Sequence, residues 1–192
     1  KRMRDLAERI TRHKWLQTAL YAVQYIVSVT LLTLPLSVYE GFLREHQYGL
    51  SSQDFGHWLG DQGKELLVSL ILGTILLTVM YAVIRKFTRS WWLWGAGVAL
   101  VFLVIVATIA SVYITPLFNT YNPLPESQLK AQILSLARAN GVPADNVYEF
   151  DASKQSKRMS ANVSGMFGTT RISMNDNLLN RGSAAEIKAV LG

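Results

Sequence analysis

The sequence predicts a multi-pass α-helical membrane protein with a small α/β (α+β) soluble portion at its carboxyl end. Three long apolar runs, at residues 15–39, 66–84 and 91–115, carry no charged side chain. Because a membrane-spanning helix needs about 20 such residues, we expect three transmembrane helices. After the third run the pattern changes to short helical and strand periodicities in a polar background. We therefore expect a membrane region over 1–125 and a separate portion over 126–192.

Composition and charge narrow the class of function. The chain has no cysteine, which excludes disulfides and thiolate metal ligands within these residues. The net charge of +6 would suit nucleic acid, but six of the 19 basic residues lie in the first 14 positions. These cations flank the first apolar run, where lipid headgroups explain them. We therefore expect the lipid bilayer as a partner and no nucleic acid. A buried helical hairpin of a soluble protein is disfavoured because such helices are shorter.

The first run is preceded by a basic, amphipathic stretch at residues 1–14, which we expect to be helical and continuous with it. Within the run, Gln24 is expected to hydrogen-bond to a neighbouring helix. Pro35 is expected to kink the helix near its end.

The connection over residues 40–65 is polar, with aromatic and leucine residues at irregular intervals. Ser51 or Ser52 would cap a short helix within it. The apolar residues of this helix would be Phe55, Trp58 and Leu59. Two interpretations stay open: a helix lying on the bilayer surface, or a helix packed against protein.

The third run begins with an interface signature and ends in prolines. Three cations and then Trp91, Trp92 and Trp94 are typical of the headgroup level. At its far end a continuing helix is excluded by three prolines, which are Pro116, Pro123 and Pro125. We expect the chain to leave the membrane there as an extended, turn-rich link.

The portion that follows alternates helix and strand. An amphipathic helix is expected first, closed by Asn140 and Gly141, and its apolar face comprises Leu129, Ile133, Leu136 and Ala137. A short strand at 146–151 and a solvated basic turn at 153–158 come next. A hairpin is predicted over 159–174, and 175–183 would link it to a last helix.

The first strand of this hairpin carries few bulky side chains between residues 160 and 165. Small side chains leave backbone N–H and C=O groups open to a second chain, as strand addition of a peptide requires. The candidate substrate-binding residues are Asn162, Val163, Ser164 and Gly165. An ordinary surface hairpin is the alternative, and composition alone favours it.

The last residues predict the start of a helix. Ser183 and Glu186 have the spacing of a capping box. Ile187, Val190 and Leu191 then fall three and four residues apart, as one apolar stripe of a helix that opens near Ala184. We expect this helix to continue beyond Gly192. Lys1 is not an initiator methionine, so we also expect residues before it.

The chain has three histidines, His13, His46 and His57. No two lie three to five residues apart, so none forms a helical metal-binding pair. We expect interfacial or structural roles for them, and no metal ligand and no catalytic residue within this chain.

Three stretches resemble one family. They are "LPLSVYEGFLREHQYGL", "YITPLFNTYNPLPESQLK" and "RISMNDNLL" with "AAEIKAVLG". Together they closely resemble the type I CAAX prenyl protease family, integral-membrane zinc metalloendopeptidases, and a bacterial member in particular. The resemblance runs from about Leu34 to the end, and the proline-rich exit from the membrane is its most specific part.

The resemblance implies a zincin-like metalloprotease domain of which this chain holds the amino-terminal part. In the family a His-Glu-x-x-His motif follows the segment similar to "AAEIKAVLG", so zinc ligands are expected immediately after Gly192. The histidines would hold zinc and the glutamate would act as base on a bound water. The family also has an Asn-Ala-aromatic edge strand that holds substrate. Asn162 matches it, whereas Val163 and Ser164 depart from it, which implies a changed specificity.

Function is therefore expected to be zinc-dependent cleavage of peptide or membrane-protein substrates by the full-length protein, with residues 1–192 inactive alone. A prenylated substrate, as in eukaryotic members, is not implied for a bacterial protein. The alternative is a non-catalytic membrane scaffold or adaptor that keeps the fold without the metal site. A channel subunit is disfavoured because no span carries a charge.

Two indications of membrane orientation conflict. Residues 1–14, before the first run, hold six basic residues. The connection over 40–65 holds two and the connection over 85–90 holds three. Under the positive-inside rule this count places the carboxyl portion outside. The resemblance implies a bacterial inner membrane protein whose protease domain is cytoplasmic, and we follow it.

Overall fold

The computed structural model describes residues 2–165, 168–183 and 186–187. Residues group into two compact units. Unit 1 comprises Lys1–Gly41 with Leu59–Ile105, and unit 2 comprises Phe42–Trp58 with Val106–Gly192. The expected ranges 1–125 and 126–192 stay a prediction, and unit 2 draws in segments that precede residue 126.

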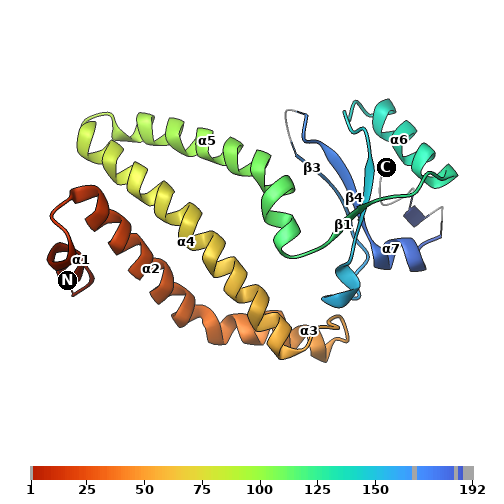
Figure 1. The fold of residues 1–192 in the computed structure, drawn as a ribbon, viewed down its shortest axis with the longest axis horizontal. Coiled ribbons are helices and arrows are strands. Elements are labelled where there is room, and N and C mark those ends of the chain that lie inside the picture. The colour runs from red at the N-terminus through yellow and green to blue at the C-terminus, as the bar shows by residue number, and fades with distance from the viewer. Residues whose placement is uncertain (1, 166–167, 184–185, 188–192) are drawn as a thin grey trace. The chain divides into compact units, whose positions relative to one another are not determined.

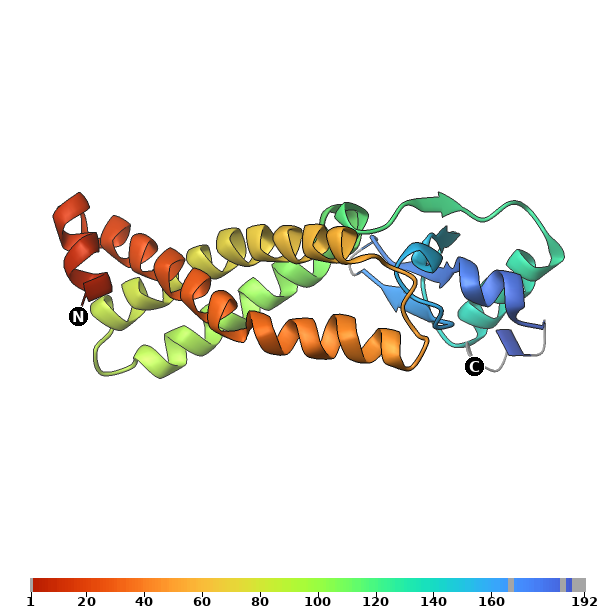
Figure 2. The ribbon, with the colours of Figure 1, turned by 90° about the horizontal axis from the view of Figure 1, so that it is seen from below.

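Unit 1 consists of long helices (Figures 1 and 2), and few of their hydrophobic side chains are buried. Its helices are α1 (Arg2–Ile10), α2 (Lys14–Ser37), most of α4 (Phe55–Lys86) and most of α5 (Trp91–Ile109). Three helical segments are long and apolar enough to cross a membrane, and at most 6% of their apolar windows is buried. A candidate span therefore lies at each of the three predicted runs, and each helix is longer or shorter than the run by some residues.

Small residues and one amide set the packing within unit 1. A Cβ placed on Gly73 of α4 would lie 2.9 Å from Ile26 Cδ1 of α2, so these helices approach closely, as small residues allow in membranes. The side-chain amide of Gln24 donates to the Met3 carbonyl at 3.3 Å, which is the expected interhelical bond. The lead-in is helical but not continuous with the span, because α1 ends at Ile10 and α2 begins at Lys14.

The first span continues past its expected end. Pro35 lies inside α2, and a π-helical segment, η1 (Val38–Leu43), follows it and leads to α3 (Arg44–Gln47). Proline lacks the N–H that would close its own helical turn. The Val38 N–H lies within bonding reach of both the Leu34 and Pro35 carbonyls, so the backbone stays helical past the proline.

The expected cap and short helix near residue 52 are wrong. Asp54 caps the helix, since its Oδ1 accepts from the His57 N–H at 3.0 Å, and the helix continues as α4 to Lys86. Ser51 and Ser52 do not cap it because their hydroxyls donate elsewhere, to the carbonyls of Gln155 and Ser153. Phe55 and Trp58 pack their rings against Phe42, which favours the packed interpretation.

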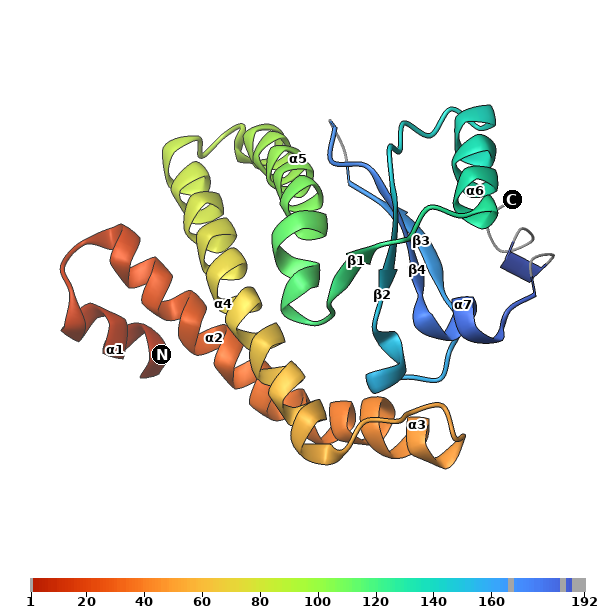
Figure 3. The ribbon, with the colours of Figure 1, turned by 45° about the vertical axis from the view of Figure 1, so that its right-hand side comes forward.

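Unit 2 contains a four-stranded mixed sheet in the order β1-β2-β4-β3 (Figure 3). The strands are β1 (Tyr121–Pro123), β2 (Val147–Phe150), β3 (Ala161–Ser164) and β4 (Arg171–Asn175). β2 and β4 are parallel, and both edge strands are antiparallel to their neighbours. The predicted strand and hairpin are confirmed. The link after the third span was expected to be extended, and it pairs as β1, with Pro123 on the edge.

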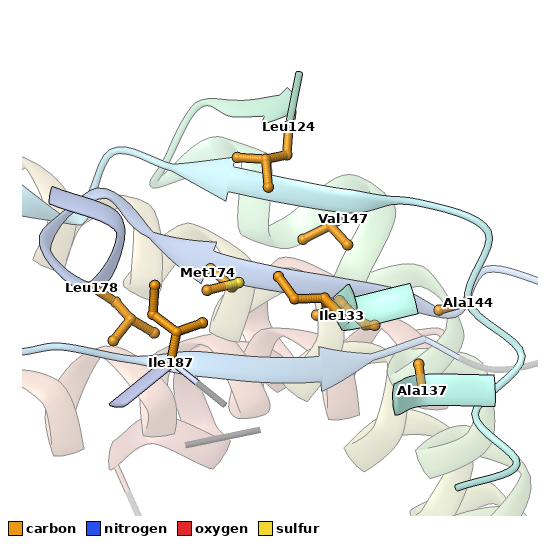
Figure 4. Close-up of a cluster of buried hydrophobic side chains, with 9 residues drawn as sticks. Leu124, Ile133, Ala137, Ala144, Val147, Met174, Leu178 and Ile187 are labelled. Carbon is orange, nitrogen blue, oxygen red and sulfur yellow. The ribbon is translucent and has the colours of Figure 1, made fainter. Parts of the chain in front are cut away.

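The core of unit 2 lies between the sheet and α6 (Gln128–Ala139), the predicted amphipathic helix (Figure 4). Ser127 caps α6 by accepting from the Lys130 N–H, and Gly141 follows its end with a φ of +72°. The fully buried side chains of the cluster include Val147, Ile172, Met174 and Leu178.

Unit 2 holds helices that were not predicted, α3 among them. The stretch expected as a link contains α7 (Asp176–Arg181). Asn175 caps it, with its side-chain oxygen accepting from the Leu178 N–H at 3.0 Å. Leu178 then enters the core at 1% exposure. The run is too short and too polar to show a helical period, so only its cap residues could have indicated it.

Candidate functional site

The candidate substrate-binding residues lie at an open edge of the sheet. Asn162, Val163 and Ser164 are in β3, and Gly165 directly follows it. β3 pairs with β4 on one side. Along its other side, no strand is found among the residues that the structure describes. The structure therefore places the predicted residues where a further strand can be added.

The register shows which backbone groups face outward. The Asn175 N–H donates to the Ser160 carbonyl at 3.0 Å, which marks these two residues as a hydrogen-bonded pair. Such pairs alternate along an antiparallel ladder, and Asn162 opposite Ser173 is the next one. The N–H and C=O groups of Ala161 and Val163 consequently point away from β4, toward the open edge.

The side chains of β3 alternate between the two faces of the sheet. Val163 lies opposite Ile172, on the face that α6 covers, and is 53% exposed. A recess of about 50 Å³ adjoins it, lined mainly by apolar side chains of α6 and β4. Asn162 is exposed on the opposite face. An added peptide would thus meet an apolar face and a polar face in alternation.

Gly165 has a conformational role that its small size alone did not reveal. Its φ is +96°, and a Cβ there would lie 2.1 Å from the Thr169 carbonyl oxygen. Only glycine adopts this backbone without strain. Gly165 therefore shapes the turn at the end of β3, whatever its relation to a substrate.

Two buried amides, which the sequence did not single out, fix the loop that leads into β3. The Asn175 side chain accepts from the Ser160 N–H at 3.0 Å and donates to the Arg158 carbonyl at 2.6 Å. The Asn177 side chain donates to the Ser156 carbonyl at 2.6 Å. Both side chains are almost fully buried. They satisfy backbone groups that would otherwise lack partners.

The basic turn before β3 was expected to be solvated, but it also bonds to a distant segment of the chain. Arg158 Nη2 donates to both carboxylate oxygens of Glu45 at 2.8 Å. The Lys157 N–H donates to the Leu50 carbonyl at 2.8 Å, and Ser51 forms a β-bridge with Ser156. The segment after α3 is therefore held to this turn, a long-range arrangement that no local pattern indicates.

A second feature that the sequence did not reveal is a cavity of about 700 Å³ at Arg171, lined by both polar and apolar side chains. The guanidinium lies 4.1 Å from the centre of the Tyr121 ring, a cation–π contact. Its Nη2 donates to Thr115 Oγ1 at 2.7 Å. Nε of Arg171 is buried and has no partner among the described residues. The arrangement holds one cation at fixed orientation beside the sheet.

The three histidines have separate surroundings. His46 Nδ1 lies 2.8 Å from the Phe42 carbonyl oxygen, and His57 Nδ1 contacts the Asp54 carboxylate. The backbone N–H of His57, and then its ring, lower the pKa of Asp54. His13 is the residue before α2. These positions agree with structural roles.

A zinc site does not fit the described residues. Within 2–165, 168–183 and 186–187, no three His, Cys, Asp or Glu side chains lie close enough together to hold a metal ion. Zinc requires about four nitrogen, sulfur or oxygen ligands in close geometry. The expectation that the ligands follow Gly192 stays a prediction.

The predicted capping box is confirmed. Glu186 N–H donates to Ser183 Oγ at 3.3 Å, and the Ser183 N–H donates to Glu186 Oε2 at 2.8 Å. These bonds from the Ser183 backbone and hydroxyl lower the pKa of Glu186. The Ile187 N–H donates to the Ser183 carbonyl at 3.0 Å, a helical bond. Ala184, Val190 and Leu191 lie outside the described residues.

Two protein-family profiles together match nearly the whole chain. The family profile described as "CAAX prenyl protease N-terminal, five membrane helices" matches residues 1–120. The profile described as "Peptidase family M48" matches residues 123–192. The two matches meet within the link that carries β1.

Individual relatives agree with these profiles. The uncharacterized metalloprotease YhfN of Bacillus subtilis is 30% identical over 192 residues, which cover 100% of this chain and 45% of that protein. CAAX prenyl protease 1 of Saccharomyces cerevisiae is 37% identical over 164 residues, covering 84% and 36%. This chain spans less than half the length of these relatives.

A solved structure carries the same fold. The crystal structure of S. mikatae Ste24p superposes with a TM-score of 0.86 at 30% identity, covering 99% of this chain and 46% of that chain. Its likeness extends through both units. With the two family profiles, it shows that this chain belongs to the CAAX prenyl protease family of membrane metalloproteases, peptidase family M48.

Proposed function

We propose that the protein containing this chain is an integral-membrane, zinc-dependent endopeptidase that cleaves peptide or membrane-protein substrates. The observation that carries this proposal is the open edge of β3 in a chain of peptidase family M48. A protease must hold its substrate extended, and an unpaired strand edge offers the main-chain bonds to do so.

Substrate binding follows from the register of β3. A peptide that adds as a strand receives hydrogen bonds from the Val163 N–H and gives them to the Ala161 and Val163 carbonyls. These bonds fix the peptide backbone regardless of side chain. Specificity then comes from the two faces, with the recess beside Val163 accepting a small apolar group and Asn162 meeting the opposite side.

The metal is the part of the proposal that lies outside residues 1–192. Zinc would supply an activated water when bound. We propose that its ligands follow Gly192, on the helix whose first turn is capped by Ser183 and Glu186. The described residues contain no ligand set for the metal.

A proline substitution tests the role of the β3 edge. Proline is tolerated at an edge position whose N–H faces outward, so Val163→Pro should fold in the full-length protein but lack one donor to the peptide. We expect kcat/KM for a peptide substrate to fall about tenfold, the value of about one hydrogen bond. Val163→Ala is the control and should keep most of the activity.

Two results would contradict this proposal. The first is undiminished cleavage by a folded Val163→Pro protein, which would exclude strand addition at β3. The second is cleavage that persists after complete removal of zinc by a chelator, which would exclude zinc dependence. Absence of any peptidase activity in the zinc-loaded full-length protein would support the scaffold alternative instead.

The location of the ligands has its own test. Residues 1–192, purified in detergent, should bind no stoichiometric zinc, whereas the full-length protein should bind one equivalent. Elemental analysis after dialysis measures both. Stoichiometric zinc in the shorter chain would overturn the proposed placement of the ligands.

Membrane orientation is also a proposal. The chain belongs to a membrane protein, and we propose that the sheet of unit 2 faces the cytoplasm of a bacterium. A cysteine introduced at Lys154, which is exposed, should then resist an impermeant thiol reagent in intact cells. Labelling in intact cells would reverse the orientation.

A further inference from the structure

A cavity of about 580 Å³ in unit 1, at the end where α2 begins and α4 finishes, is unused by the proposed protease function. Its lining holds three cations, Arg4, Lys14 and Arg85, and one carboxylate, Glu8. These side chains come from α1, α2 and α4. Three separate helices therefore direct positive charge into one space.

The cations differ in how far they are already paired. Arg4 lies 3.5 Å from Glu8 and 3.2 Å from Asp5, so its charge is largely compensated. Arg85 Nη1 donates to Thr18 Oγ1 at 2.9 Å, a neutral partner that leaves its charge and further N–H groups available. The ammonium of Lys14 has no partner among the described residues. Arg85 and Lys14 thus remain free to bind an anion.

The first turn of α2 adds to this positive potential. Its N-cap, His13, makes no side-chain cap bond, so His13 supplies no side-chain acceptor to the N–H groups of the first turn. A helix amino terminus carries a partial positive charge and is a site that favours phosphate groups. Lys14, Gln17 and Thr18 of these first turns line the cavity.

A second cavity, of about 250 Å³, continues from the first along α2 and α4. The two share Thr18, Tyr21 and Tyr81 in their linings. Beyond the shared residues the second is lined by Ala22, Tyr25 and Leu77, which are apolar or aromatic. Cations line the first cavity, whereas the second is lined by tyrosines, a threonine and aliphatic side chains without a cation. The pair therefore matches a molecule with an anionic head at one end and a hydrocarbon tail along the other.

The position of α1 supports a membrane source for this molecule. Ala7 of α1 is buried, whereas Leu6 and Ile10 are 48% and 61% exposed. Exposed apolar side chains beside a basic face are typical of a helix that lies in the headgroup region. The cavity mouth would accordingly stand at the level of lipid phosphates.

We propose that this pair of cavities is a binding site for one anionic phospholipid. The phosphate-containing headgroup lies against Lys14, Arg85 and the first turn of α2, and an acyl chain follows the groove past Tyr21 and Leu77. A zwitterionic lipid binds less tightly because its own cation opposes Lys14 and Arg85. The site fixes α1 to the beginning of the first span.

Native mass spectrometry of the full-length protein in detergent, titrated with dioleoylphosphatidylglycerol, tests the site. We expect the double variant Lys14→Gln with Arg85→Gln to bind this lipid about 30-fold more weakly, since each cation near an anionic surface contributes about fivefold. Lys14→Gln alone, which removes no contact between residues, should weaken binding about fivefold. Dioleoylphosphatidylcholine should bind the unchanged protein about tenfold more weakly than phosphatidylglycerol does.

The control variant is Arg89→Gln, which removes a cation from the short connection after α4 without touching the cavity lining. It should bind phosphatidylglycerol as the unchanged protein does. An equal loss for Arg89→Gln would overturn the site in favour of diffuse surface charge. Displacement of the lipid by inorganic phosphate at about 10 mM would overturn the lipid as occupant, because free phosphate lacks the chain that fills the groove.

Discussion

The two units of this molecule treat apolar side chains in opposite ways. In unit 1 the apolar residues point outward: Leu32 of α2 is 81% exposed, and the windows of the three spans are at most 6% buried. In unit 2 the apolar residues form a closed cluster, in which Val147 and Met174 are fully buried. Hydrophobicity alone therefore does not identify a core, because the apolar side chains of helices long enough to span a membrane are mostly exposed.

The difference extends to how each unit is held together. Unit 1 uses close helix contacts, such as Gly73 beside Ile26, and a few polar bonds. Unit 2 uses buried polar side chains, above all Asn175 and Asn177, to fix the loop before the edge strand. The unit that carries the candidate site thus depends on specific hydrogen bonds more than the membrane unit does.

The largest expected effect separates the two kinds of apolar residue. Ile172→Ala, at 2% exposure in β4, should lower the free energy of unfolding by about 3 kcal/mol because it leaves a cavity. Leu32→Ala should change it by about 0.5 kcal/mol, the small transfer term of one lipid-facing leucine. Urea unfolding of the full-length protein in micelles measures both. An equal loss for Leu32→Ala would show that protein covers this face of α2.

Next in size is the buried amide at the cap of α7. Asn175→Ala removes three hydrogen bonds and should cost about 2 to 3 kcal/mol, since the partners are left buried. Asn175→Asp keeps both accepted bonds but buries a charge and sets a carboxylate oxygen against the Arg158 carbonyl, so its loss should be at least as large. Thermal unfolding ranks the variants. A clearly smaller loss for the aspartate variant would mean that the two accepted bonds dominate.

A smaller loss is expected at the turn after β3. Gly165→Ala should lower the free energy of unfolding by about 2 kcal/mol, because φ is +96° and the new Cβ meets the Thr169 carbonyl. Gly60→Ala provides the contrast in α4, where nothing lies within 4 Å and φ is ordinary. Helix propensity predicts slight stabilisation there. Similar unfolding midpoints for the two would exclude a strained turn.

The capping box should contribute less again. Ser183→Ala removes the hydroxyl that bonds to the Glu186 N–H and carboxylate, and should cost about 1 kcal/mol of helix stability. Ser183→Thr keeps a hydroxyl and should retain most of it. Hydrogen exchange of the following amides measures local opening. Unchanged exchange in the alanine variant would contradict a role for the cap.

The smallest effect is a pH dependence of the same cap. Because its bonds to Ser183 lower the pKa of Glu186 in the folded state, the contribution is present above the unfolded value of about 4.3. It is lost as the pH falls through the lowered folded pKa. Local hydrogen exchange should therefore show stabilisation of the helix start that fades below about pH 4, and Glu186→Gln should remove this dependence. A dependence that persists in Glu186→Gln would assign it to another group.

Local patterns predicted the regular elements of both units well. The spans follow from long charge-free runs, α6 from its apolar period and cap, and the hairpin from two short strands around glycine. The small side chains of residues 160–165 favoured a strand open to a second chain, and β3 lies at a sheet edge. The capping box was predictable because its whole geometry lies within four residues.

Features set by distant contacts were missed. The true helix cap is Asp54, because Ser51 and Ser52 donate to carbonyls about 100 positions along the chain. Arg158 finds Glu45 in the same way. These partners lie far apart in the sequence, and no periodicity reports them. The residues that line the cavity at Arg171 likewise come from separate segments. They lie together only in the folded sheet, so the sequence did not indicate the cavity.

The edge opposite β3 determines how many strands this sheet can accept. The Leu124 N–H donates to the Val147 carbonyl, so by alternation the nitrogen of Pro123 faces outward, and proline has no hydrogen to offer. β1 is also only three residues long. A strand that joins this sheet is therefore favoured along β3, because β1 offers fewer outward backbone donors. The shortage of donors at β1 also disfavours head-to-tail pairing of two copies of this sheet.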